Sequence, residues 1–192
     1  MIGTRGVYGF RKDGRDKLTY NAYDSYVAYL GKHVLKFCLK HSIQELNHLC
    51  DRIILIEHNT IPTQDDIRAC IDNGWYEGVG TNVKWFDLLG GIQGNLEVLF
   101  RAKKAFMMND KTFIENSFYC SYGYIINLDL NMLEFRTGFQ RFPDYSNRYG
   151  VDPVDDYYPC KLMRGYMLPL DKTVDWYIED MKSSEKKIEI VY

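Results

Sequence analysis

Residues 20–26 combine tyrosine rings with short polar side chains, a mixture that suits the binding of a planar ligand. The residues concerned are Tyr20, Asn21, Tyr23, Asp24 and Tyr26. The rings supply flat apolar faces with a polar tip, and the amide and carboxylate groups supply hydrogen bonds. We therefore expect a ligand site here. The alternative is that the polar pair only caps a loop and the tyrosines pack on a half-buried strand.

Arg5 and Arg11 place positive charge just before this segment. Strand alternation puts the two side chains on one face, because successive side chains of a strand point to opposite sides. Guanidinium groups bind phosphate through paired hydrogen bonds, so both arginines are candidates for holding an anionic ligand. The alternative is a solvated strand face, or an edge protected against pairing with another strand.

Residues 74–94 contain Trp75 and Trp85 among six glycines. Bulky rings in a glycine-rich segment, whose backbone has wide conformational freedom, are typical of a pocket wall or a lid. Both tryptophans are therefore candidates for ligand contacts. Gly78 and Gly80 do not form a dinucleotide-binding fingerprint, because no strand leads into them with the required spacing. The segment therefore predicts ligand contacts but no Rossmann fold.

The histidines and cysteines form neither a metal site nor a catalytic triad in the sequence. The four histidines lie between His33 and His58 without H-x-H or H-x-x-x-H spacing. No serine lies in a G-x-S-x-G elbow. The five cysteines are scattered and include no C-x-x-C pair. We expect no metal, no cofactor and a reduced, cytoplasmic protein.

A β-hairpin must position the polar and aromatic residues of the opening segment. Asp13 and Gly14 stand between two alternating runs, 4–12 and 17–23, which predicts a tight hairpin turn. A second hairpin is expected over 118–137, where Asp and Asn residues separate two further alternating runs. Polar groups and rings then meet at one end of the first hairpin.

Helices and shorter strands complete the predicted fold. Helical periodicity and capping residues predict helices over 30–41, 42–51, 63–73 and 95–106, and a last helix from Asp171 or Thr173 through Met181. The remaining predictions are a strand buried on both faces at 53–56, a long lid or oligomer arm at 138–169, and a final strand at 186–192. Together they predict one α+β domain over 1–192, in which the two hairpins, strand 53–56 and the final strand form a mainly antiparallel sheet covered by helices.

The charge pattern excludes some partners. The formal net charge is −2 and no block of five or more like charges occurs, so we expect no sequence-independent binding of duplex nucleic acid. No signal peptide or apolar run of membrane length is present, so we expect no membrane partner. Aromatic residues make up 15% of the chain, which suits either a ligand site or a sheet-rich core.

The opening of the chain also carries a resemblance. The run T-R-G-x-Y-G-F-R-x-x-G, followed by Y-N-x-x-D-S-Y and L-G, resembles the start of a family of small phage, bacterial and fungal proteins. The match covers about the first sixth of the chain and, more weakly, the later run YIINLDLNMLEFRTG. The fold that this resemblance implies is similar to the layered sandwich of the N-terminal-nucleophile hydrolases. In those enzymes the first strand starts at a catalytic Cys, Ser or Thr.

Within that resemblance Thr4 is the candidate nucleophile. A terminal threonine uses its own α-amine as the general base, so Thr4 would react only after removal of residues 1–3. Asn21 or Asp24, at the end of the second strand, would then lie near it.

The leading hypothesis is a protein that binds or sequesters a small anionic, nucleotide-like ligand. Arginine matches phosphate and tyrosine stacks on bases, which is its physical basis. The resemblance implies a phage origin, and we expect such a protein to act against host immune signalling by withdrawing a signalling molecule. Two alternatives stay open: an amidohydrolase that uses Thr4 after processing, and a protein-interaction or homo-oligomeric module that uses the aromatic segment 138–169.

Overall fold

The computed structural model describes residues 4–78, 80 and 82–185, and it contains the predicted opening hairpin. Strands β1 (Gly6–Lys12) and β2 (Arg15–Asn21) pair antiparallel on either side of the turn. Asp13 and Gly14 both have positive φ, 52° and 70°, which matches the twist that a two-residue hairpin turn requires. The turn's two N–H groups donate to the Asp129 carboxylate at 2.6 and 3.0 Å. The tip of the second hairpin thus caps the first.

The main sheet has five strands in the order β2-β1-β5-β6-β7. Strands β5 (Tyr122–Asn127) and β6 (Met132–Thr137) form the second predicted hairpin, and β7 (Lys161–Met167) pairs with β6. β1 and β5 run parallel, whereas the other neighbouring strands of this sheet run antiparallel. The α+β class and the mainly antiparallel sheet are therefore confirmed.

A second, two-stranded parallel sheet joins β3 (Ile53–Ile56) to β4 (Ala105–Met108). The prediction that 53–56 enters the antiparallel sheet is wrong, and Ile54 is exposed rather than buried. The predicted helix 95–106 is also too long, because β4 begins at its end. The apolar residues of β4 take their hydrogen bonds from β3, and such tertiary pairing overrides local helix propensity.

Helices fill the remaining predicted ranges. The described residues contain six α-helices: α1 (Lys32–Lys40), α2 (Ile43–Arg52), α3 (Gln64–Asp72), α4 (Trp85–Leu89), α5 (Leu96–Arg101) and α6 (Val174–Glu185). Capping boxes at Ser42 with Glu45 and at Thr63 with Asp66 start α2 and α3, as the sequence predicts. Only α4 lies in a segment for which no helix was predicted. No helix in the part that the structure describes has the length and apolar character needed to span a membrane.

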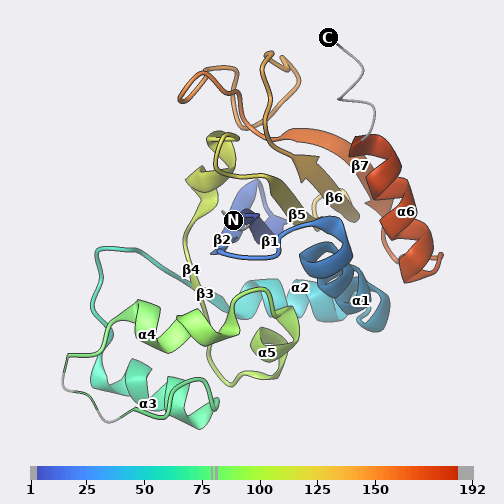
Figure 1. Cartoon of the computed structure of the whole chain (residues 1–192). Helices are drawn as coiled ribbons and strands as arrows, with labels where there is room; N and C mark the ends of the chain where they lie inside the picture. Colours follow the sequence, from blue (N-terminus) through green and yellow to red (C-terminus); the bar gives the residue numbers. More distant parts are fainter. Residues whose placement is uncertain (1–3, 79, 81, 186–192) are drawn as a thin grey trace.

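The predicted loop 138–169 contains one unpredicted element, the edge strand β7. Its residues, KLMRGYM, are largely exposed and show no clean alternation, so the sequence lacks the usual strand signal. The predicted strand 186–192 lies outside the described residues. Residues 138–160 form the loops at the top of Figure 1.

The helices and the two sheets divide the core into layers (Figure 1). Rings on one face of the main sheet, among them Phe10 and Tyr124, pack against α1, α2 and α6. The opposite face carries Val7, Ile125 and Cys160 in a smaller cluster. A third cluster lies in the lower part of the molecule, between α3, α4 and β4. The end of β2 and the start of the segment after β4 lie where these layers meet.

A buried ion network fixes the long loop to the sheet. The Glu134 side chain, on β6, is 1% exposed and accepts hydrogen bonds from Arg148 at 2.7 and 2.8 Å. It also accepts from Arg136 Nε at 2.9 Å and from Asn127 Nδ2 at 2.6 Å. Arg148 comes from the loop, so one carboxylate holds β5, β6 and the loop together.

We predict that Glu134→Gln lowers the free energy of unfolding by about 3 kcal/mol at pH 7, because it leaves two guanidinium groups without their carboxylate. Urea denaturation of both proteins measures the difference. Glu179→Gln is the control, since Glu179 forms an exposed ion pair with Lys182 at 3.0 Å, and its effect should stay within about 0.5 kcal/mol. Equal effects of the two substitutions would contradict this account.

The same network predicts a pH dependence. Burial alone raises the pKa of Glu134, but the hydrogen bond from Arg148 and the charge of Arg136 outweigh it, so the pKa lies below its ordinary value of 4.5. The stabilisation is therefore complete above that value and is lost as the pH falls through the folded pKa. Between about pH 5 and pH 2 the native protein should lose more stability than Glu134→Gln, measured by urea midpoints.

Candidate functional site

A cavity of about 750 Å³ opens between the end of the first hairpin, the segment 86–95 and strand β4. Residues from each contribute to its wall, and the start of α1 closes one side. The predicted ligand residues in the wall are Tyr20, Asn21, Tyr23 and Asp24. Other polar or aromatic wall residues include Tyr8, Tyr29, His33, His58, Phe86 and Asp110.

Asp110 connects the two sheets at the base of this cavity. Its backbone N–H donates to the Leu18 carbonyl at 2.8 Å. Its carboxylate accepts from the Tyr20 N–H at 2.9 Å and from the Thr19 hydroxyl at 3.2 Å. Asp110 is the second residue after β4, so the end of β4 is tied to β2, the outer strand of the main sheet. This contact fixes the cavity wall from both sheets.

The same carboxylate orients His58. His58 Nε2 lies 2.6 Å from Asp110 Oδ1, while the histidine side chain is 68% exposed. A carboxylate bound to one ring nitrogen sets the orientation of the ring. The described contacts give His58 Nδ1 no partner. This nitrogen is therefore free to exchange a hydrogen bond with a ligand at the cavity.

Tyr8 provides a buried hydroxyl group at the opposite wall. The Gly94 N–H donates to the Tyr8 oxygen at 2.7 Å. Burial raises the pKa of Tyr8, so the phenol keeps its proton at neutral pH. The described contacts include no acceptor for that proton. The hydroxyl can thus donate to a ligand while its oxygen stays bound to Gly94.

Gly94 is required at this position by its backbone and its surroundings. Its φ is +77°, and an added Cβ would lie 3.1 Å from Asn21 Oδ1. The Asn21 amide nitrogen donates to the Tyr23 carbonyl and, at 2.8 Å, to Ser25 Oγ. The amide group of Asn21 is therefore fixed, with its oxygen turned toward Gly94. The wall offers this oxygen as a hydrogen-bond acceptor.

Aromatic side chains form the outer rim. Tyr23 and Phe86 are 73% and 74% exposed. Tyr29 is also exposed, with its ring centroid 5.3 Å from that of His33. Tyr20 is held edge-on against Phe113 at 4.9 Å. Exposed rings at the rim can close over a flat ligand without any change of the core.

Other predicted site residues lie elsewhere. Trp85 packs behind the wall, with its ring 5.1 Å from Phe106, and its indole nitrogen is buried without a hydrogen-bond partner among the described residues. Trp75 packs between two core clusters. Tyr26 stands beside the cavity, with its ring 6.1 Å from that of Tyr29, but does not line it.

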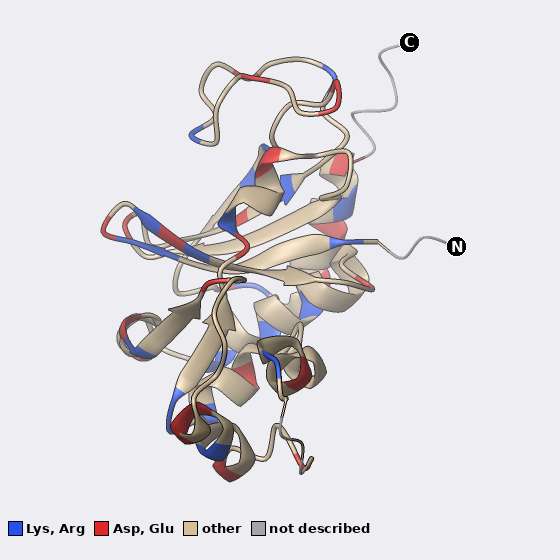
Figure 2. Cartoon of the chain, turned by 90° about the vertical axis from the view of Figure 1, so that its left-hand side faces the viewer, with Lys and Arg blue, Asp and Glu red and all other residues tan. Residues whose placement is uncertain are grey.

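The two predicted arginines do not meet. Arg5 immediately precedes β1 and Arg11 lies near the other end of the strand, six residues away, which corresponds to roughly 20 Å along a strand. Arg11 is bound to Asp16 at 3.3 Å and to Asp129 at 3.7 Å near the hairpin tip, where Figure 2 shows both charge signs side by side. Arg5 lies over the Tyr119 ring, 5.9 Å from its centroid. Neither lines the cavity, and Thr4 does not line it either.

The residues described as lining the cavity include no Lys or Arg. Their ionisable members are two aspartates, two histidines and four tyrosines. The wall is therefore mildly acidic where the ligand hypothesis needs positive charge for phosphate.

Sequence reasoning missed Tyr8, His58 and Asp110. The alternation of β1 indicates only that Tyr8 faces the core. Asp110 follows a segment predicted as helix, so its position at a strand end was not evident. Only the parallel pairing of β3 with β4 brings His58 next to Asp110.

Comparison with protein-family models, curated proteins and solved structures found no match to this chain.

We predict that Asp110→Ala lowers the free energy of unfolding by about 2 kcal/mol, because the Tyr20 N–H and the Thr19 hydroxyl lose their acceptor. Asp110→Asn keeps an acceptor oxygen and should cost less. Urea denaturation measures both, with the exposed loop residue substitution Asp152→Ala as the control. A loss no larger than that of the control would show that Asp110 does not join the sheets.

Proposed function

We propose that this protein binds a small, ring-containing molecule in the cavity between the hairpin end, segment 86–95 and β4. The observation that supports this is one preformed cavity of about 750 Å³ with aromatic walls and a few fixed polar groups. Small-molecule sites have this size and this composition. The sequence pattern at residues 20–24, which suggested a ligand site, forms part of its wall.

The ligand is proposed to carry hydrogen-bonding edges like those of a nucleobase. Tyr8 offers a donor, the Asn21 amide oxygen an acceptor, and His58 a nitrogen that can serve as either. Tyr20 and Tyr23 offer ring surfaces for stacking. This part of the nucleotide-like hypothesis agrees with the geometry of the wall.

The ligand's charge is proposed to be neutral or positive. Two aspartates and no Lys or Arg occur among the residues described as lining the cavity, and burying a phosphate beside carboxylates costs electrostatic energy. A nucleoside, a free base or an aromatic amine is therefore favoured over a nucleotide. Sequestration of a signalling molecule by a phage protein stays part of the proposal through the sequence resemblance only.

A thermal-shift panel tests the ligand class. It compares free bases, nucleosides and aromatic amines with the matching monophosphates and with cyclic dinucleotides. A ligand at 100 times its Kd should add about 2.7 kcal/mol of stability. We expect the unphosphorylated compounds to raise the melting temperature more than their phosphates do. A larger shift with the phosphates would support the hypothesis of an anionic ligand instead. No shift with any compound would contradict the proposal.

Substitutions locate the ligand in the cavity. Tyr8→Phe removes the hydroxyl donor, and Tyr23→Ala removes an exposed rim ring. Tyr8→Phe should weaken binding of the best compound about fivefold, measured by calorimetry, since one hydrogen bond contributes about 1 kcal/mol. Tyr23→Ala should weaken it by about tenfold or more, since stacking of a ring on a base contributes about 1–3 kcal/mol. Phe142→Ala removes a similarly exposed ring outside the cavity wall and should leave binding unchanged. Equal effects of Tyr23→Ala and Phe142→Ala would place the ligand elsewhere.

A second candidate function is the amidohydrolase that uses Thr4. One observation favours it: the Thr4 carbonyl accepts the Ser25 N–H at 3.2 Å, and Asn21 pairs with Gly6 at the end of β2. An asparagine thus lies near the start of the first strand, as in the arrangement that the resemblance implies.

Intact-protein mass spectrometry tests this candidate. The Gly3-Thr4 bond must be cut to free the amine, because an acylated amine cannot accept the hydroxyl proton. We expect the uncut chain. A species that begins at Thr4 would support the hydrolase, and Thr4→Ala would then abolish its activity. An uncut chain in every preparation rules this mechanism out.

A further inference from the structure

A row of aromatic side chains lies on the surface where the segment 116–121 meets the long loop. Phe118 is central: its ring centroid is 4.9 Å from that of Tyr119 and 5.0 Å from that of Tyr157. Phe139 extends the row, 6.3 Å from Tyr157. Phe118, Tyr119 and Phe139 are all exposed. We call these four residues the aromatic row.

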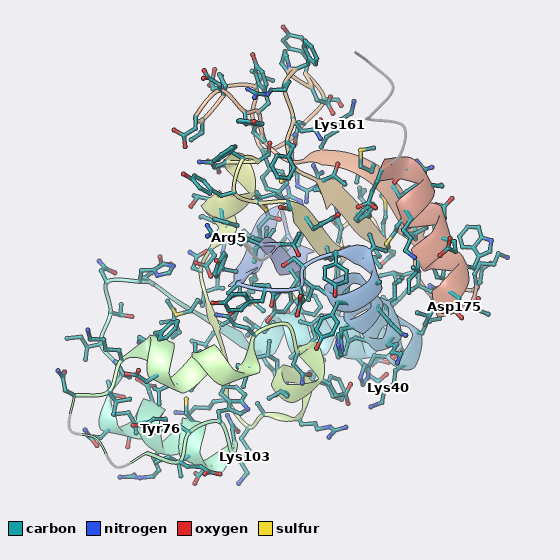
Figure 3. The ribbon with its side chains drawn as sticks, viewed as in Figure 1. Arg5, Lys40, Tyr76, Lys103, Lys161 and Asp175 are labelled. Carbon is teal, nitrogen blue, oxygen red and sulfur yellow. The ribbon has the colours of Figure 1, made fainter. Side chains whose placement is uncertain are left out.

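Two arginines lie against the aromatic row, one on Tyr119 at its end and one on Tyr157 within it. Arg141 stacks on Tyr157, 3.9 Å from the ring centroid, and Arg5 lies 5.9 Å from the centroid of Tyr119. Figure 3 labels Arg5 in the upper middle of the molecule, away from the lower lobe that carries Tyr76 and Lys103. Within the described contacts neither guanidinium has a carboxylate partner. Their N–H groups therefore remain available to an anionic partner.

Hydrogen bonds fix the position of the aromatic row in the unbound protein. The Phe139 N–H donates to the Ser117 carbonyl at 2.8 Å, and the Gln140 N–H donates to Ser117 Oγ at 3.0 Å. Phe139 has a φ of +56°, which is rare for a bulky residue and costs energy. The surrounding bonds thus fix a large apolar ring in an exposed position. Such preorganisation reduces the entropy lost on binding.

Nearby acidic residues limit the total positive charge. The Asp155 carboxylate accepts from Asn116 Nδ2 at 2.9 Å, and Asp156 follows it in the same loop. The chain as a whole has a net charge of −2. Two arginines in this setting cannot hold a duplex by charge alone. Binding at the aromatic row must depend on stacking, with the guanidinium groups as an addition.

We propose that the aromatic row with Arg5 and Arg141 binds single-stranded nucleic acid. Unpaired bases stack on exposed rings irrespective of sequence, and the two arginines beside the row bind the phosphates between those bases. A duplex offers no free base faces, so it cannot use the rings. This surface contains the combination of arginine and tyrosine that the cavity lacks, and the inference is independent of the cavity ligand.

Fluorescence anisotropy with labelled 12-nucleotide oligo-dT and oligo-U tests the proposal. We expect both single strands to bind more tightly than a 12-base-pair duplex. Phe118→Ala should weaken binding by about tenfold, since stacking contributes 1–3 kcal/mol per base. Arg141→Ala should weaken it as well and should lower the slope of log K against log salt by about one contact.

Trp176→Ala is the matched control, since it removes a similarly exposed ring on α6, outside both the aromatic row and the cavity wall. It should leave oligonucleotide affinity unchanged, and thermal melting confirms that each variant is folded. The proposal is overturned if neither oligonucleotide binds at protein concentrations of about 100 µM, the weak end of non-specific nucleic-acid binding. It is also overturned if Phe118→Ala binds normally, or if light scattering shows a dimer that only Phe118→Ala dissociates.

Discussion

The contact between Asp110 and the edge of β2 is the constraint on which the candidate site depends. One residue donates its N–H to Leu18, accepts from Tyr20 and Thr19, and pairs with His58. The five-stranded sheet and the small parallel sheet share no strand, so this residue supplies a direct polar link between them. Without it the cavity between the sheets would lose its fixed wall. A site formed in this way is set by tertiary structure and not by a local motif.

A second polar centre has the same role at the other end of the molecule. The Glu134 carboxylate binds Arg136 and Arg148, and so fixes the loop that carries Phe139 and Tyr157. Burying a carboxylate is unfavourable unless its oxygens are satisfied, and here three side chains satisfy them. The long loop can therefore present exposed rings and still remain ordered. The buried Glu134 network therefore stabilises the loop whose surface carries Phe139 and Tyr157 of the aromatic row.

The opening of the chain contains tyrosines, short polar residues and arginines close together in sequence, but the folded protein places them on two different surfaces, the cavity and the aromatic row. Tyr20, Asn21, Tyr23 and Asp24 belong to the cavity, whereas Arg5 belongs to the aromatic row. Antiparallel pairing brings Arg5 close to the end of β2, but its contacts lie on the side of the segment 116–121: its carbonyl accepts the Ser121 N–H at 2.9 Å and its guanidinium lies over the Tyr119 ring. The cavity therefore suits an uncharged ring, and the aromatic row suits an anionic chain.

Local interactions allowed the sequence by itself to determine both hairpins, the capped helices and the α+β class. The Asp13-Gly14 turn and the capping boxes involve residues within three positions of each other, so their signals are complete in a short window. Tertiary structure alone decided β4, β7, the pairing of His58 with Asp110 and the different partners of Arg5 and Arg11. The physical reason is that a strand takes its hydrogen bonds, and a buried polar group its partners, from segments distant in the chain.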